Sequence, residues 1–204
     1  MVWETLPVIR RGPDADLPGA AVWPFIPPYS EGRLPHNRAG RLISTANARL
    51  RTEGAPFAPT FMGAWRANAR VLVAVSWFYE FDSRVKPQVP YAVFPLDAPC
   101  WLMAGIARPT RMADGSRRLT VAVITVAPNA VLTGVGHHRS PALLRSPDEA
   151  RRWLDADADE ALGLLRPYPN ESMGVEAVPM DVKIPGNEAF ELPRALESRF
   201  GANA

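Results

Sequence analysis

The apolar residues of the chain fall into short runs that are rich in β-branched and aromatic side chains and bounded by Pro, Gly or Asp. Such runs are typical of β-strands. They predict strands over residues 6–10, 20–25, 69–81, 90–96, 100–108, 118–127 and 175–180. The pair Asp114-Gly115 separates two of these runs and predicts a hairpin turn between them.

Helical periodicity is confined to a few short segments. In residues 146–156, Ser146 is placed to be the N-cap, Pro147 the first helical residue and Glu149 the third, which is the arrangement of a capping box. Further helices are expected over residues 59–68, 158–165 and 191–200. Because strands dominate and do not alternate with helices, the pattern predicts an α+β fold with mostly antiparallel strand pairing.

Composition bounds the class of protein. The 204 residues are 47% hydrophobic and 22% charged, and they contain no Gly/Ser-rich linker or repeat, so we expect one domain over residues 1–204. No apolar run approaches the ~18 residues of a membrane helix, and the N-terminus lacks the apolar core of a signal peptide. The single cysteine, Cys100, excludes a disulfide framework and a cysteine-rich zinc site. We therefore expect a cytoplasmic protein without a membrane partner.

Charge is distributed unevenly although the net charge is only +2. Residues 33–70 hold seven arginines and one acidic residue, a local charge of +6, whereas residues 148–160 have a local charge of −4. The basic stretch is suited to a polyanion such as nucleic acid. The alternative is a solvated, arginine-rich surface, since only Lys86 and Lys183 among the 23 basic residues are lysine.

Glu80 is the first candidate for chemistry, because it lies between aromatic residues in the run Trp77 to Phe81. A carboxylate in such surroundings either forms a structural pair with an arginine or serves in proton transfer. The pair His137-His138 suits proton transfer or plain solvent exposure. Adjacent histidines on a strand point in different directions and no carboxylate lies at ligand spacing, so we expect no metal site and no cofactor.

Several motifs in order resemble the SRAP (SOS response-associated peptidase) family, whose members recognise abasic sites in single-stranded DNA. The resemblance extends from about residue 6 to residue 180. Its motifs are WPFIPPY (23–29), ISTANAR (43–49), WFYEF (77–81), VITVAPNA (123–130), GHHRSP (136–141), PDEARRWLD (147–155) and RPYPNESMGVEAVP (166–179). Asn-Ala-Arg occurs twice, and the order of motifs selects Asn47 to Arg49 over the copy at residues 68–70.

The resemblance implies a single domain with a bifurcated, mostly antiparallel sheet, part of it a small barrel, flanked by short helices. It implies catalytic roles for Asn47, Glu80 and His137. It further implies a monomer bound to single-stranded DNA, especially at abasic sites, and nucleoid-associated when on DNA. The residues assigned to DNA contact are Trp23, Tyr29, Arg49, His138 and Arg139.

The family's nucleophile is a cysteine exposed when the initiator methionine is removed, and it forms a DNA–protein crosslink. This sequence has Val2 at that position, so we expect the cysteine-bearing N-terminal strand to be absent. We expect Cys100 to be a buried, inert thiol at the start of an apolar strand. Whether the protein is an enzyme stays open. The alternatives are an abasic-site protein whose coding start lies upstream, a non-catalytic DNA-binding relative, an inert relative, and a cysteine hydrolase that uses Cys100 and His137.

Overall fold

The computed structural model describes residues 4–180, and its contacts divide the chain into two compact units. The first unit comprises the chain up to Ala74 together with residues 102–126 and 141–166. The second comprises residues 75–101, 127–140 and, among the described residues, 167–180. That residues 1–204 form one domain stays a prediction. The helix predicted over residues 191–200 lies outside the described residues.

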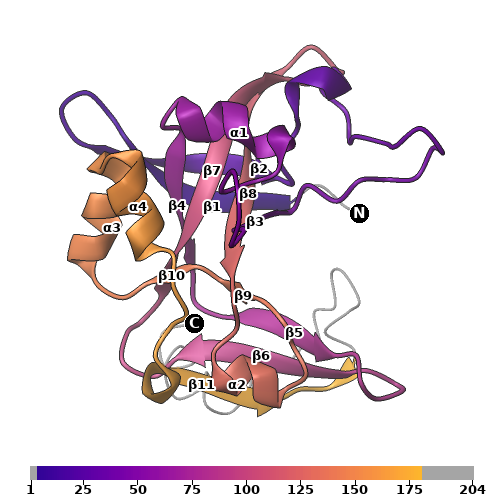
Figure 1. Ribbon diagram of the computed structural model, residues 1–204, viewed down its shortest axis with the longest axis vertical. Coiled ribbons are helices and arrows are strands. Elements are labelled where there is room, and N and C mark those ends of the chain that lie inside the picture. The colour runs from indigo at the N-terminus through magenta and orange to yellow at the C-terminus, as the bar shows by residue number, and fades with distance from the viewer. Residues whose placement is uncertain (1–3, 181–204) are drawn as a thin grey trace, which may run out of the picture. The chain divides into compact units, whose positions relative to one another are not determined.

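The first unit is built on a sheet that closes into a barrel of five strands (Figure 1). Its strands are β1 (Glu4–Arg11), β2 (Asp16–Trp23), β4 (Arg70–Val75), β7 (Trp101–Arg111) and β8 (Arg117–Val126). The order β7-β4-β1-β2-β8 is closed by a further pairing of β7 with β8. The short strands β3 (Asn47–Arg49), β9 (Ser140–Pro141) and β10 (Leu143–Leu144) extend this sheet. The predicted α+β class with a barrel-like part is confirmed.

The pairing of strands is mixed. β1 pairs antiparallel with β2 and β4, and β7 with β8, whereas β2 and β3 both run parallel to β8. The hairpin predicted at Asp114-Gly115 is confirmed, since Arg111 lies opposite Arg117 across the turn and Gly115 has a φ of +85°. The parallel pairings join segments that are far apart in sequence, and no local pattern predicts them.

Three helices cover the barrel: α1 (Pro59–Arg66), α3 (Pro147–Asp155) and α4 (Ala158–Leu164). Each of them was predicted, with α1 ending two residues before the expected limit. Ser146 is confirmed as the N-cap, since its hydroxyl accepts a hydrogen bond from Glu149 N. The Glu149 carboxylate accepts from Arg145 N, one residue before the N-cap, so the second bond of the predicted capping box is displaced by one residue. Asp157 caps α4 in the same way, through Glu160 N.

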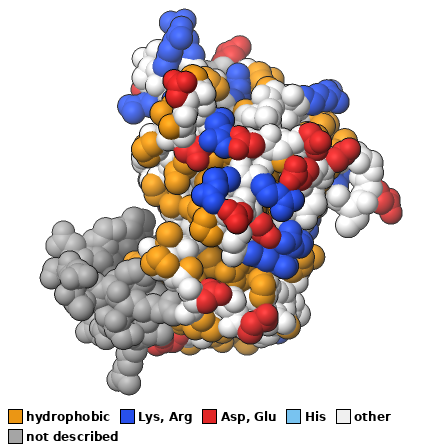
Figure 2. Space-filling view, turned by 90° about the vertical axis from the view of Figure 1, so that its left-hand side faces the viewer, with side chains coloured by type: hydrophobic (Ala, Val, Ile, Leu, Met, Phe, Trp, Pro, Cys, Tyr) orange, Lys and Arg blue, Asp and Glu red, His pale blue; other side chains and the backbone are white. Residues whose placement is uncertain are grey.

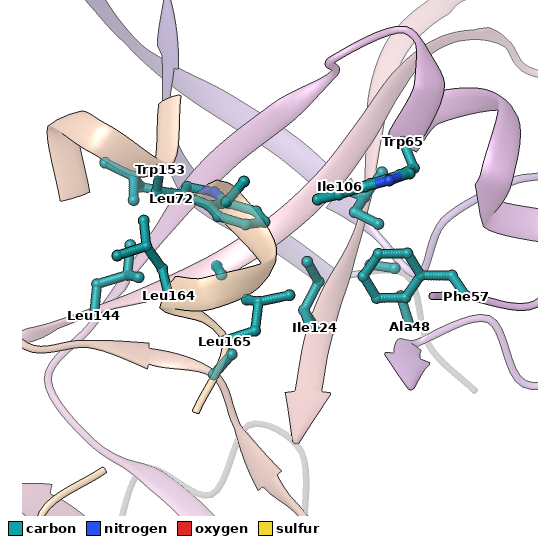
Figure 3. Packing of buried hydrophobic residues seen from close by; sticks show 14 of the residues in the cluster. Ala48, Phe57, Trp65, Leu72, Ile106, Ile124, Leu144, Trp153, Leu164 and Leu165 are labelled. Carbon is teal, nitrogen blue, oxygen red and sulfur yellow. The ribbon is translucent and has the colours of Figure 1, made fainter. Parts of the chain in front are cut away.

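The core of the first unit lies between these helices and the strands. Figure 3 shows Trp65 of α1 and Trp153 of α3 packed with Ile106 and Ile124 from β7 and β8. Trp153 is fully buried, and its indole nitrogen donates to Val71 O at 2.9 Å. Burial of large apolar side chains, at roughly 25 cal/mol per Å², is the main stabilising term here.

Arg70 supplies hydrogen bonds to backbone carbonyl groups at the C-terminal end of α3. This buried side chain donates from Nε to Trp153 O and also binds Ala156 O, so it satisfies carbonyl groups that the helix leaves open. Its guanidinium lies 5.7 Å from the Trp65 ring centroid and 5.5 Å from that of Trp153. A cation at a helix C-terminus is favourable, and burial lowers the pKa of Arg70. The second Asn-Ala-Arg copy therefore has a structural role.

The second unit contains an antiparallel sheet of β5 (Phe78–Asp82), β6 (Val89–Pro95) and β11 (Met173–Ala177), in the order β11-β6-β5. It also holds α2 (Ala130–Gly134) and the 3₁₀ turn η2 (Asn170–Ser172), whereas the 3₁₀ turn η1 (Pro28–Ser30) belongs to the first unit. The single strand predicted over residues 69–81 is wrong, because the chain leaves the barrel after Val75 and starts β5 at Phe78. No Gly or Pro marks this break in the sequence.

Cys100 also differs from expectation. It is exposed rather than buried, because it lies in the loop that precedes β7 and not within the strand. Within residues 4–180, no helix combines the length and the apolar character that crossing a membrane requires.

Candidate functional site

Glu80 lies in the middle of β5, paired with Tyr91 of β6. Side chains alternate along a strand, so Glu80 shares a face with Phe78 and Asp82. The Phe78 ring contacts the buried Trp101 ring, with centroids 5.7 Å apart. Only 15% of the Glu80 side chain is exposed. The carboxyl group is therefore held in a largely apolar setting by a rigid strand.

His137 follows α2, whose start is fixed by Asn129. The buried Asn129 side chain accepts a hydrogen bond from Leu132 N at 3.0 Å and donates to Tyr168 O at 3.1 Å. It is thus the N-cap of α2 and also ties the helix to the segment before η2. His137 N in turn donates to Leu132 O at 2.9 Å. The backbone of His137 is therefore placed by the capped helix.

The imidazole of His137 contacts Glu80 directly. His137 Nε2 lies 2.8 Å from Glu80 Oε2, and His137 Nδ1 lies 2.8 Å from Arg139 O. A carbonyl oxygen only accepts hydrogen bonds, so Nδ1 must carry the hydrogen. With Nδ1 protonated, a hydrogen bond between Nε2 and Oε2 contains one further proton. That proton belongs either to a neutral carboxylic acid or to an imidazolium beside a carboxylate.

Burial raises the pKa of Glu80 from an ordinary 4.5 to about 7, and the charge of His137 acts in the opposite direction. Desolvation is the larger of the two effects, because burial disfavours the charged form of the carboxyl group. A carboxyl group with this pKa exchanges its proton near neutrality, which is the property of a general acid or base. Among the described residues, the partner of Glu80 is a histidine and not the arginine of a structural pair.

Asp82 and Arg84 fasten the His137 loop to β5. Arg84 donates from Nε to Asp82 Oδ1 at 2.9 Å and from its terminal nitrogen to Asp82 Oδ2 at 2.8 Å. The same terminal nitrogen donates to Gly134 O, at the end of α2, at 2.9 Å. These hydrogen bonds lower the pKa of Asp82. We call Asp82 and Arg84 the loop clamp.

Gly136 completes the clamp. Its φ is +78°, a region that favours glycine, and a Cβ there would overlap Asp82 Oδ1 and Arg84 Nε. The chain therefore approaches the clamp closely only because residue 136 has no side chain. Neither the clamp nor the Asn129 cap was predicted. The available signals were Pro-Asn-Ala before an apolar turn, typical of a helix start, and the Gly before His137.

His138 and Arg139 lie beside this pair in the second unit. The His138 ring stacks on the His137 ring, with centroids 5.5 Å apart and planes 27° apart. The expectation that the two rings point in different directions is wrong, because both residues lie in a loop and not on a strand. His138 is exposed and Arg139 half-buried. Arg139 also positions His137 through its backbone carbonyl.

Asn47 and Arg49 belong to the first unit, on β3. They are exposed, whereas Ala48 between them is fully buried in the core cluster. Alternation along β3 therefore places both polar side chains on the outer face. The register with β8 sets Asn47 opposite Val123 and Arg49 opposite Thr125. The exposed Asn47–Arg49 copy of the tripeptide thus contrasts with the copy whose Arg70 is buried.

The two aromatic candidates differ in role. Trp23 is half-buried, and its indole nitrogen donates to Ala46 O at 2.9 Å, directly before β3. It therefore supports the strand that carries Asn47. Tyr29, on η1, is 59% exposed, and its hydroxyl lies 3.3 Å from Thr60 Oγ1 on α1. The structure thus groups Trp23 with Asn47 and Arg49, places Tyr29 on a separate turn, and groups Glu80, His137, His138 and Arg139 in the second unit.

Comparison with known proteins adds a family and a fold. The family model described as SOS response associated peptidase (SRAP) matches residues 3–185. A solved protein from Bacteroides thetaiotaomicron is 23% identical with a TM-score of 0.70, covering 87% of this chain and 75% of that one. One from Bordetella bronchiseptica is 24% identical with a TM-score of 0.68, covering 86% and 84%. A phage-related protein from Bordetella bronchiseptica is 23% identical with a TM-score of 0.57, covering 85% and 76%.

The TM-scores show that this chain shares the fold of these proteins. A search of curated proteins found no match.

Proposed function

Because the chain belongs to the SOS response associated peptidase (SRAP) family, we propose that it binds single-stranded DNA and acts on abasic sites in the DNA damage response. The observation that carries the proposal is the contact between Glu80 and His137, in which one proton is shared at 2.8 Å. A carboxyl group of raised pKa beside an oriented imidazole is suited to proton transfer at neutral pH.

The proposed chemistry begins with opening of the abasic sugar. The closed form is a hemiacetal, and it opens when the ring oxygen gains a proton while the C1′ hydroxyl loses one. Protonated Glu80 donates to the ring oxygen, the bond from C1′ to that oxygen breaks, and C1′ becomes an aldehyde as its hydroxyl proton passes to water. Glu80 is then a carboxylate beside the Nδ1-protonated His137 and regains its proton from solvent.

DNA contact is assigned to exposed polar and aromatic side chains. Arg49 on the outer face of β3 is suited to a phosphate, and Asn47 beside it is assigned to positioning the reacting group. Arg139 and His138 flank the proton-transfer pair in the second unit and are assigned to the strand next to the lesion. Trp23 and Tyr29 supply aromatic surface of the kind on which unpaired bases stack.

A covalent crosslink additionally requires an amine or thiol that attacks the aldehyde. The second candidate function is therefore non-covalent recognition of abasic or single-stranded DNA. It is favoured by the observation that the 204 residues contain one cysteine, Cys100, which directly precedes β7.

The test compares two labelled single strands of one sequence, intact and with one abasic site. On a denaturing gel, a product that resists denaturation without borohydride indicates a stable crosslink, and a product trapped only by borohydride indicates an imine. Binding without either product supports the second candidate. Equal failure of both strands to bind would refute both.

Arg49→Gln is expected to weaken binding and to reduce the salt dependence of log K by about 0.7, the value for one phosphate contact to a single strand. Arg152→Gln is the matched control. It removes the same charge from α3, where Arg152 is paired with Glu160 at 2.6 Å, and is expected to leave binding unchanged. Equal effects of the two substitutions would argue against an Arg49 contact.

A further inference from the structure

Arginines of the first unit differ in whether a carboxylate lies beside them. Those around α3 and α4 are paired with carboxylates, and Figure 2 shows acidic and basic side chains interspersed on one face of the molecule. The pairs are Arg11 with Asp16 and Asp155, Arg151 with Asp148, Arg152 with Glu160, and Arg166 with Glu149. Charge on these arginines is locally neutralised.

Three arginines of the β7–β8 hairpin are different. Within residues 4–180, no carboxylate lies within 4.0 Å of the side-chain nitrogens of Arg108, Arg111 or Arg117. Arg111 and Arg117 lie directly opposite each other, a like-charge arrangement that costs stability in a sheet. Arg108, Arg111 and Arg117 therefore carry positive charge that no ion pair within the described residues neutralises, whereas Arg118 of the same hairpin interacts with Asp114 in its turn.

An apolar pocket of about 540 Å³ adjoins this charge within the first unit. Its volume lies in the range of about 300–1,000 Å³ typical of small-molecule sites. Its lining includes Phe25, which precedes η1, Tyr29 on η1, Gly63 and Ala67 from the region of α1, and Arg108. Tyr29 is held by its hydroxyl contact with Thr60, which leaves most of the residue exposed.

Arg108 joins the pocket to a second hollow. Its terminal nitrogen donates to Ile26 O at 3.1 Å, which fixes the guanidinium. Arg108 also lines a neighbouring hollow of about 450 Å³, and the other charged residues of its lining are Arg111 and Glu31. Two arginines and one glutamate leave this hollow with an excess of positive charge. An occupant that suits both hollows has a flat apolar part and an anionic part.

We infer that this pocket binds an unpaired nucleobase of single-stranded DNA, with the adjoining phosphate on Arg108 and Arg111. Every base has a π-face, so an aromatic side chain over an apolar pocket accepts bases with little sequence preference. Arginine is suited to the phosphate because its planar fork binds two oxygens at once. The inference rests on the proposed function and adds a subsite on η1, α1 and the β7–β8 hairpin to the residues of β3 and β5.

Gly63 offers a direct way to fill the pocket. It lines the pocket from α1, and a Cβ added there meets nothing within 4 Å. Leucine is also a far better helix former than glycine, so Gly63→Leu fills the space without weakening the helix. Gly163 in α4 is the matched control, since a Cβ there also meets nothing within 4 Å.

The experiment measures binding of a labelled, intact oligodeoxythymidine to the full chain by fluorescence anisotropy. Gly63→Leu and Tyr29→Ala are each expected to weaken binding about tenfold, within the range for one stacked base. The double variant is expected to bind like either single variant, because both remove the same base. Arg108→Gln and Arg111→Gln are expected to reduce the salt dependence of log K, and Gly163→Leu to leave binding unchanged.

The outcomes separate the inference from the proposed function. Parent-like binding by Gly63→Leu or by Tyr29→Ala, with thermal unfolding confirming that the variant is folded, overturns the base pocket. Tyr29→Ala keeps the test valid if Gly63→Leu does not fold, since the Tyr29 side chain is exposed. No binding of any strand by the parent refutes the proposed function, and the inference with it.

Discussion

At the scale of residues, the central feature is the single proton in the hydrogen bond between Glu80 and His137. The Nδ1 atom of His137 is committed to Arg139 O, so the imidazole offers only Nε2 to Glu80. Burial of the carboxyl group raises the pKa of Glu80 to about 7. The pair is therefore arranged to exchange a proton with a substrate near neutral pH, which an exposed glutamate of ordinary pKa does poorly.

The same raised pKa predicts a pH-dependent stability. A carboxyl group whose pKa is higher in the folded chain than in the unfolded chain binds its proton more tightly when folded. Its contribution to the free energy of unfolding is therefore full below pH 4.5 and is lost as the pH rises toward 7. Glutamine in Glu80→Gln resembles the protonated acid and still donates to His137 Nε2.

The expected result is that the free energy of unfolding falls more steeply between pH 4.5 and 7 for the parent than for Glu80→Gln. The excess fall is on the order of 2 kcal/mol for a shift of this size. Urea unfolding at several pH values measures it. Parallel curves for parent and variant would show that the pKa of Glu80 is not raised in the folded chain.

At the scale of elements, the loop clamp is what holds His137 beside β5. The clamp joins the end of β5 to the end of α2 through Asp82, Arg84 and Gly134 O. Arg84→Gln is expected to loosen the loop and to slow sugar opening about ten- to a hundredfold, the cost of misplacing a reacting group by about 1 Å. It is also expected to change the ¹⁵N shifts of the His137 ring, which report the Nδ1 proton.

Arg84→Lys distinguishes positioning from charge. Lysine keeps the positive charge but cannot bind both Asp82 oxygens and Gly134 O in one plane. If positioning is the role, the ¹⁵N spectrum and the rate for Arg84→Lys resemble those of Arg84→Gln. A lysine variant with the parent's spectrum and rate would mean that only the charge of Arg84 matters.

Local patterns predicted the elements well where the signal itself is local. Ser146 and Glu149 identified the start of α3 because the signal for an N-cap involves neighbouring residues only. Residues 69–81 were predicted as one strand because nothing in the apolar pattern distinguishes Val75, which ends β4, from Phe78, which begins β5. Cys100 was predicted to be buried because apolar residues follow it directly in the sequence. It is exposed because β7 begins only at Trp101.

At the scale of the whole molecule, the fold depends on pairings between distant segments. The barrel closes through β7 with β8, and β3 is held by parallel pairing with β8. The pattern of apolar and polar residues along one sequence does not show which distant segments pair. The proximity of Glu80 to His137 was likewise expected only through the family resemblance and not from the residues alone. The clamp, the Asn129 cap and the apolar pocket became visible only with coordinates.

The most direct test of the central claim measures sugar opening itself, independently of any nucleophile on the protein. A single strand with one abasic site is saturated with protein, and methoxyamine in excess captures the aldehyde as it forms. The account predicts that the parent accelerates capture, and that Glu80→Gln binds the strand equally well but captures at the rate of free DNA. Equal acceleration by parent and Glu80→Gln would contradict a role for Glu80 in proton transfer. Absence of acceleration by a parent that binds the strand would leave the protein as a non-covalent binder of single-stranded DNA.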